Sequence, residues 1–340
     1  MAYRPIAPIA QGPDIFPQPI TSLSFDPVSD TLWSGNSSGY ASAYYSAQGM
    51  RGVRFRVGSE NLAVKKIVSD ENHIRACCVA GEGVGAWTKG GMNKWTPRPI
   101  TTFSNNLNSS TFAAATASPE IVLLNSLTGT ATRQAPVLSV VNQLHFANTS
   151  LLSGSSDGIL RCHDPRTGMR RDGGAENSVK AHASEIQGLQ SSGNYVYTIG
   201  WGLRQSRPIP DPLVKLYDLR TMRALPPIPF PAGPAFINLL PRRSSSIVVA
   251  SNQGLINVVD TSNPTNGNEF YQLDTPAFIS SAAVSPTGTY MAFGDAGGAI
   301  HLLSAADGDT TLPLNGFEGQ PIEWADTPEP PPEIEWDDST

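Results

Sequence analysis

The stretch VVNQLHFANTSLLSGSSDGILRCHDPRTG, residues 140–168, decides the fold. It contains an apolar segment around Leu144, a second segment that ends in Gly154, a tight turn at Asp157-Gly158 and a third segment over 159–163. Short apolar segments bounded by turn residues are typical of β-strands. The same unit recurs through residues 20–49, 67–90, 102–129, 186–221, 236–262 and 279–304.

A small residue marks the end of the second strand in every unit. These positions are Gly35, Gly81, Thr116, Gly154, Gly200, Ser251 and Gly294. Repeats of about 40 residues with four short strands each are typical of β-propellers. We therefore expect an all-β, seven-bladed propeller of the WD40 type over residues 20–314, with degenerate Trp-Asp endings such as Tyr217-Asp218. A propeller is more often a binding scaffold than an enzyme.

The N-terminal arm, residues 1–19, is rich in Pro and Ile. A ring of blades needs a strand that completes its last sheet, because an open edge invites aggregation. We expect Tyr3–Ile9 to supply this strand, since prolines are tolerated on an edge. Thr310–Leu314 is the competing segment, and both remain open at this point.

The C-terminal tail, residues 315–340, is acidic and Pro-rich, with Trp324 and Trp336 standing among carboxylates. Such composition is typical of disorder, whereas two tryptophans favour a docked peptide. Charge is also divided unevenly along the chain. All 23 basic residues lie within residues 1–243 together with 15 of the 29 acidic ones, so this part carries a formal +8 and the remainder −14. A basic part suits an acidic partner and an acidic tail repels nucleic acid, although solvated surfaces also need charge.

The composition also bears on compartment. The sequence contains no apolar run of 18 residues, so we expect no membrane span. The first residues lack the apolar core of a signal peptide. The three cysteines, Cys77, Cys78 and Cys162, form no disulfide framework. We expect reduced, buried thiols in a cytosolic or nuclear protein.

The fifth unit carries an insertion, GWGLRQSRPIPDP, at residues 200–212. Most other units turn here within two to four residues, so we expect a loop between the second and third strands, at the mouth of the central channel. Trp and Arg are enriched at binding hot spots, and we predict partner contacts at Trp201, Arg204 and Arg207. The alternative packs Trp201 onto the blade and leaves both arginines in solvent.

No motif predicts catalysis or a metal. The five histidines lie in different units without ligand spacing, so we predict no catalytic, cofactor-binding or metal-binding residues. His182 is expected in a structural network with a Ser or Thr and with the Asp or aromatic residue of the third strand. Basic doublets such as Lys65-Lys66 are interpreted as solvated loop residues, with weak phosphate contact as the alternative.

Several segments resemble one known family. The insertion resembles the N-terminal propeller of the catalytic subunit of poly(A)-nuclease deadenylases, and this resemblance continues over residues 211–223, 226–230 and 233–236. Residues 156–158, 164–166 and 317–321 and the pair Gly12-Pro13 support it. The resemblance covers essentially the whole chain, and the sequence is similar to that of a filamentous-fungal member of the family.

The resemblance implies a longer subunit. After the propeller come a linker that binds a pseudokinase-bearing regulatory homodimer, an inactive ubiquitin-hydrolase-like domain and a Mg²⁺-dependent 3′–5′ exonuclease of poly(A). The metal-binding carboxylates of that nuclease are expected outside residues 1–340. The resemblance also implies an indirect link to poly(A)-binding protein and a cytoplasmic location that includes mRNA-processing bodies.

We therefore expect a non-catalytic scaffold of an mRNA deadenylation complex. Tail residues Trp324 and Trp336 join Trp201, Arg204 and Arg207 as predicted partner contacts. Three alternatives remain: weak direct binding of poly(A) RNA by the basic blades, a purely structural spacer, and a propeller enzyme whose residues converge in the channel.

Overall fold

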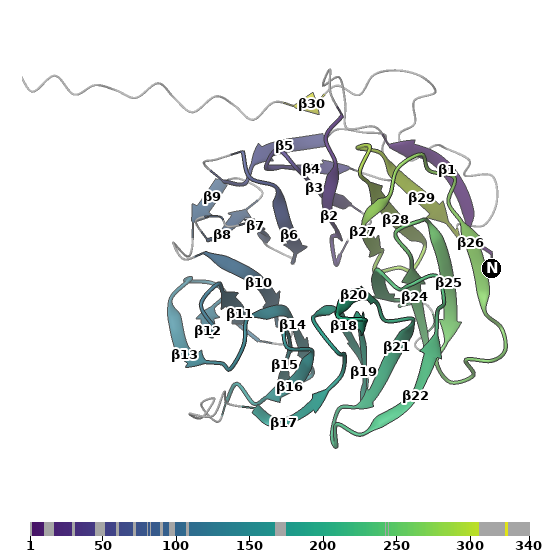
Figure 1. Ribbon diagram of the computed structural model, residues 1–340. Coiled ribbons are helices and arrows are strands. Elements are labelled where there is room, and N and C mark those ends of the chain that lie inside the picture. The colour runs from purple at the N-terminus through teal and green to yellow at the C-terminus, as the bar shows by residue number, and fades with distance from the viewer. Residues whose placement is uncertain are drawn as a thin grey trace, which may run out of the picture.

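A computed structural model describes most of the chain. The described ranges are residues 2–9, 17–28, 31–44, 52–58, 61–70, 73–79, 81, 83–88, 91–94, 99–106, 109–166, 175–241, 243, 245–305 and 324–325. These residues are all β, in seven sheets arranged around a central axis (Figure 1). The predicted all-β propeller with seven blades is confirmed. The acidic tail lies outside the described residues except for Trp324 and Ala325.

The four main strands of each blade pair antiparallel, and they run from the axis outwards in chain order except in blade 7, where the first strand of the chain is outermost (Figure 1). Blade 1 is β2 (Ile20–Phe25), β3 (Leu32–Asn36), β4 (Tyr40–Tyr44) and β5 (Gly52–Arg56); blade 2 is β6 (Val64–Ser69), β7 (His73–Cys78), β8 (Val84–Thr88) and β9 (Gly91–Lys94); blade 3 is β10 (Ile100–Asn105), β11 (Thr111–Thr116), β12 (Glu120–Asn125) and β13 (Ala131–Pro136). Blade 4 is β14 (Val141–Ala147), β15 (Ser150–Ser155), β16 (Ile159–His163) and β17 (Ala175–Lys180).

The remaining three blades include the two irregular ones. Blade 5 is β18 (Ile186–Ser192), β19 (Tyr195–Arg204), β21 (Leu213–Asp218) and β22 (Ala224–Pro229), with β20 (Arg207–Pro210) paired to β19; blade 6 is β23 (Phe236–Leu239), β24 (Ser246–Ala250), β25 (Leu255–Asp260) and β26 (Glu269–Gln272). Blade 7 is β27 (Ile279–Val284), β28 (Tyr290–Asp295) and β29 (Ile300–Ser304), followed by β1 (Arg4–Ile9).

The core lies between the blades. One apolar cluster fills each junction between neighbouring sheets, for example Leu152 and Leu160 of blade 4 against Val196 and Tyr217 of blade 5. A second strand therefore packs on both of its faces, and β24 is buried along its whole length. Such strands consist of consecutive apolar and small residues rather than a polar alternation.

At three of the recurring small residues, Gly35, Gly154 and Gly294, the inner strand of the next blade approaches closely. A Cβ atom on Gly154 would lie 2.7 Å from Cγ2 of Ile186, and one on Gly294 would lie 2.3 Å from Cγ2 of Ile20. Each isoleucine begins the inner strand of the following blade. Larger side chains would push the blades apart, which explains why small residues recur at the repeat period.

The first strand of the chain completes the last sheet. β1 pairs antiparallel with β29, with Arg4 opposite Ser304 (Figure 1). Ile9 is buried in the cluster between blades 7 and 1, and the Tyr3 hydroxyl donates a 2.6 Å hydrogen bond to the Gly288 carbonyl. The competing segment, Thr310–Leu314, lies outside the described residues.

Candidate interaction surface

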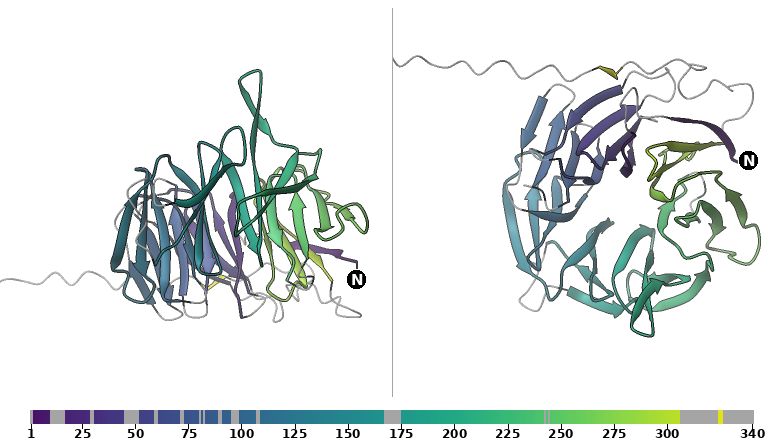
Figure 2. Two further views of the ribbon diagram at one scale, coloured as in Figure 1. Left: turned by 90° about the horizontal axis from the view of Figure 1, so that it is seen from below. Right: turned by 45° about the horizontal axis from the view of Figure 1, so that its top comes forward.

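The insertion in blade 5 is a β-hairpin rather than the predicted loop. β19 continues for ten residues, and its outer part pairs with β20, with Trp201 opposite Pro210 and Arg204 opposite Arg207. Gln205 and Ser206 form the turn with φ of 50° and 62°, as a two-residue type I′ turn requires. The hairpin projects from one face of the propeller (Figure 2).

Register gives the hairpin two different faces, because residues directly opposite each other share a face and neighbours alternate. One face carries Trp201, Leu203, Pro208 and Pro210, and the other carries Gly202, Arg204, Arg207 and Ile209. Leu203 is 54% exposed and Ile209 is 37% exposed. The predicted contacts are therefore divided: half-buried Trp201 lies on the apolar face, whereas both arginines lie on the other face.

The basic face carries two positive charges that no described carboxylate balances. Arg204 and Arg207 are exposed and lie directly opposite each other. Among the described residues, no carboxylate forms an ion pair with either arginine. Like charges at opposed positions destabilise a strand pair, so an acidic partner at this tip would relieve a repulsion as well as gain attraction.

The base of the hairpin is held by a polar network around His182. Its Nδ1 lies 3.0 Å from Oδ2 of Asp211, and its Nε2 lies 3.0 Å from Oγ1 of Thr198. Lys215 forms a 3.1 Å ion pair with the same Asp211 oxygen. The predicted structural role of His182 is confirmed, although the Asp precedes the third strand, β21, instead of lying on it.

Electrostatics in this network are consistent with a fixed structural unit. Burial lowers the pKa of His182, and the hydrogen bond to Asp211 only partly opposes this effect. Burial alone would raise the pKa of Asp211, but hydrogen bonds from Lys215 and His182 outweigh it and hold the pKa of this carboxyl below its usual value. Around neutral pH the network thus contains a neutral imidazole beside an ionised carboxylate.

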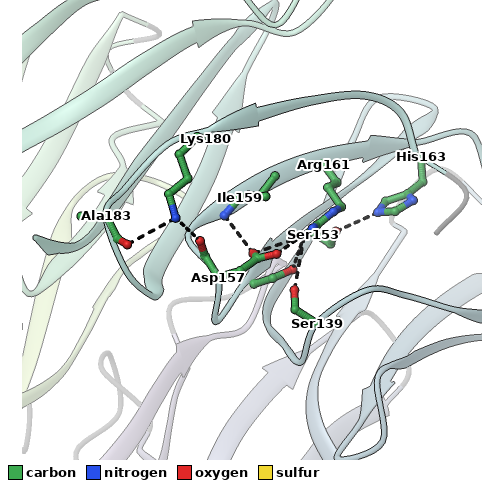
Figure 3. Close-up of polar contacts among 9 residues, drawn as sticks. Ser139, Ser153, Asp157, Ile159, Arg161, His163, Lys180 and Ala183 are labelled. Atoms are coloured by element: carbon green, nitrogen blue, oxygen red, sulfur yellow. Dashed lines mark hydrogen bonds and ion pairs between the residues drawn. The ribbon is translucent and has the colours of Figure 1, made fainter. Parts of the chain in front are cut away.

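The link between blades 4 and 5 ties this base to both sheets. The Ser184 amide donates to the Trp201 carbonyl and the Trp201 amide donates to the Glu185 carbonyl, both at 2.9 Å. On the blade 4 side, Lys180 Nζ donates to the carbonyls of Asp157 and Ala183 (Figure 3). The hairpin therefore rises from a platform that two blades hold in place.

Exposed apolar residues on the same face were missed by the sequence reasoning. Leu138 is 75% exposed and Phe278 is 63% exposed. They lie in the links that lead into β14 and β27, which share the hairpin's face because these links bond to the turns before the third strands: Ser156 to Val140, and Ala296 to Phe278. An isolated apolar residue in a short link gives no periodic signal.

The one described tail contact, Trp324, does not lie at the hairpin. Trp324 and Ala325 form β30, which pairs parallel with β5 of blade 1, whereas the hairpin belongs to blade 5. Trp336 lies outside the described residues. Cys77, Cys78 and Cys162 are free and buried.

Within the described ranges, no group of three or more His, Cys, Asp or Glu side chains is placed to hold a metal ion. None of the described segments is a helix long and apolar enough to cross a membrane.

The interpretation of Lys65 and Lys66 as loop residues is wrong. Both residues lie on β6, an inner strand. Lys66 lines the central channel, a cavity of about 420 Å³ to which the inner strands of all seven blades contribute.

Comparison with known proteins agrees with this architecture. The family model described as PAN2 N-terminal matches residues 16–304. The PAN2-PAN3 deadenylation complex catalytic subunit PAN2 of Cryptococcus neoformans is 35% identical over 370 residues, covering 100% of this chain and 31% of that relative. The corresponding subunit of Emericella nidulans is 29% identical over 335 residues, covering 96% and 28%. The chain thus spans about a third of the curated relatives' length.

A solved structure shows the same fold. The Neurospora crassa Pan2 WD40 domain superimposes with a TM-score of 0.79 and 20% identity, covering 90% of this chain and 96% of that one. Since the family model matches most of the chain, from before β2 to the end of β29, the assignment rests on the whole propeller and not on one motif. The chain belongs to the PAN2 N-terminal family.

Proposed function

We propose that this chain is a non-catalytic interaction module of a deadenylation complex like the one named for its relatives, and that the β19–β20 hairpin contacts the regulatory subunit, PAN3. The observation that carries the proposal is the projecting hairpin with a fixed base and an uncompensated arginine pair. We expect the catalytic centre of such a complex in the part of the relatives' length, about two thirds, that this chain does not span.

The geometry favours a recognition role for the hairpin over a structural one. Its residues from Leu203 to Pro210 are exposed, so they contribute little to the buried core. Pro208 and Pro210 remove backbone donors from β20, an edge strand, which discourages unspecific strand addition. What remains for recognition is side-chain chemistry: an apolar face and a cationic face.

The test is binding of the 340-residue chain to purified PAN3 by calorimetry. The variant Arg204→Ala/Arg207→Ala is expected to weaken binding at least tenfold, with an unchanged unfolding midpoint. The matched control, Arg166→Ala/Arg220→Ala, removes the same charge from two exposed arginines that pair with Asp164 and Asp218. Equal affinity of both variants and the parent chain would remove the hairpin from the interface.

A salt series separates this proposal from direct RNA binding. Phosphate contacts make affinity fall steeply with ionic strength, and the same arginine variant can be titrated with poly(A) alone. Tight, salt-dependent binding of poly(A) that the arginine substitutions abolish would replace PAN3 with RNA as the hairpin's partner. Undiminished PAN3 binding after removal of residues 202–209 would reduce the hairpin to a spacer.

A further inference from the structure

The wall of the central channel is neutral apart from one cation. The polar side chains that line it are mainly amides and one histidine: Asn105, Gln143, His145, Gln187, Gln190 and Asn238. Among the described residues that line the cavity, Lys66 is the one with a formal charge and none is a carboxylate. The carboxylates of Asp26 and Asp70 accept hydrogen bonds from the lining residues Ser69 and Asn105, so the described lining itself carries a single positive charge at neutral pH.

Lys66 has only weak partners in the part of the chain that the structure describes. Its Nζ lies 3.4 Å from Oγ1 of Thr102 and 5.6 Å from the centroid of the Phe103 ring. No described carboxylate forms an ion pair with it. Burial lowers the pKa of Lys66 to about 8, with Lys65 lowering it further and Cys77 opposing. A half-buried ammonium without a counter-ion is costly, and an anion would offset that cost.

The nearby histidine does not supply the missing charge. Nε2 of His145 lies 2.8 Å from Oγ of Ser191. Burial and then the charge of Lys66 lower the pKa of His145 to about 4. At neutral pH His145 is therefore an uncharged imidazole, and the positive charge of Lys66 helps to keep it uncharged.

Two uncommitted amides line the same cavity as Lys66. The side chains of Gln190 and Asn238 line the channel and form no hydrogen bond within the described part of the chain. Amide N–H groups and an ammonium are the donors that a phosphate oxygen accepts. The volume of about 420 Å³ lies at the small end of ligand pockets, which suits a free phosphate or a compact phosphate ester.

We propose that the channel binds a small phosphate-bearing anion at Lys66, with Gln190 and Asn238 as neutral donors. This site is separate from the hairpin surface and independent of the proposed PAN3 contact. Its ligand is defined by chemistry: one tetrahedral oxyanion, free or carried on a small organic group.

The test uses the 340-residue chain and follows its thermal unfolding midpoint at rising inorganic phosphate, with chloride holding the ionic strength constant. Binding to the folded state alone is expected to raise the midpoint by about 2 °C once phosphate exceeds its dissociation constant about tenfold. The rise should saturate and should disappear in Lys66→Met. Lys65→Met is the matched control, because Lys65 is the exposed neighbour on the same strand and should keep the full rise.

Glycerol 3-phosphate in place of phosphate distinguishes the two sources of the anion. Tighter binding of the ester assigns the site to phosphate esters, and tighter binding of phosphate assigns it to the free ion. An equal rise in Lys66→Met, or no saturable rise in the parent chain, would overturn the proposal.

A measurement on the unaltered chain covers the case in which Lys66→Met does not fold. Phosphate should protect Lys66, and not Lys65, from acetylation by acetic anhydride, as read by mass spectrometry. Equal modification of Lys66 with and without phosphate would also overturn the proposal.

Discussion

Blades 4 and 5 anchor the start of their third strand in the same way, but they differ in the connection that precedes it. Each places an Asp two residues before its third strand, where the carboxylate accepts a backbone hydrogen bond: Ile159 to Asp157 at 3.0 Å, and Leu213 to Asp211 at 3.2 Å. Each also pairs that Asp with a cation four residues later, Arg161 in blade 4 and Lys215 in blade 5. The two blades therefore share one anchoring device.

The difference lies before the Asp. Blade 4 closes its second and third strands with a short turn at 155–158, whereas blade 5 inserts the paired segment from Trp201 to Pro210. The anchoring Asp keeps its place in spite of the insertion. The fold thus requires the Asp but not a short turn before it, so the residues of the hairpin are available for recognition.

Substitution of either aspartate should give the largest change in unfolding free energy, and the two changes should differ between the blades. Asp211→Ala is expected to cost about 3 kcal/mol of unfolding free energy, because it leaves Nδ1 of His182, whose side chain is 0% exposed, without its partner, although Lys215 keeps a 2.6 Å hydrogen bond to the Ala181 carbonyl. Asp157→Ala should cost about 1–2 kcal/mol, since Arg161 keeps a 3.0 Å hydrogen bond to Ser155. Urea denaturation measures both, and equal losses would contradict the stronger coupling in blade 5.

Acid should reveal the two histidines whose pKa values are lowered, His145 on blade 4 and His182 in the link to blade 5. The folded pKa values of His145 and His182 lie below 6.5, so the unfolded chain takes up protons first as the pH falls. Each histidine should therefore remove up to about 1.4 kcal/mol of stability per pH unit between pH 6.5 and its folded pKa. Asp211 has a lowered pKa, and its contribution stays intact until the pH falls below about 4.

The measurement is the unfolding free energy between pH 7 and 5 for the parent chain, His145→Gln, His182→Gln and the double variant. Each single substitution should flatten the pH dependence, and the double substitution should flatten it by the sum, because the two sites share no partner. A pH profile that neither substitution changes would contradict the lowered pKa values.

The smallest effect concerns the two turns. The blade 4 turn has Gly158 at φ 73°, whereas the hairpin places Gln205 and Ser206 at positive φ. Gln205→Asn/Ser206→Gly should stabilise the hairpin by about 0.5–1 kcal/mol, because Asn and Gly adopt this region with less strain. Amide hydrogen exchange should slow in β19 and β20 and stay constant in blade 4. Unchanged exchange in the hairpin would show that the turn carries no strain.

The blades could be predicted from sequence because their spacing has a steric cause. Gly154 and Gly294 each face an isoleucine of the next blade, so small residues had to recur at the repeat period. The hairpin could not be predicted as paired strands, because Pro208 and Pro210 read as loop residues and Gln205-Ser206 is not a typical turn pair. Because the position of the turn was not known, the sequence also could not show that Trp201 and the two arginines lie on opposite faces of the hairpin.

The channel lysine escaped prediction for a different reason. The pairing of β6 with β7 shifts register between Val64 and Lys66, so simple alternation from Val64 does not give the side of the strand on which Lys66 lies. Similar irregularities begin the inner strands of most other blades. Bulges of this kind depend on contacts across the sheet, which a single strand sequence does not contain.

The pairing of β1 with β29 also sets an order of events during synthesis. Arg4 pairs with Ser304, so β1 waits for a partner strand that is made about 300 residues later. At about 5–20 residues per second, that wait is roughly 15–60 s, during which β1 and the unfinished blades expose unpaired edges. The ring can close only after β29 leaves the ribosome, and the nascent chain is most in need of chaperone protection until then.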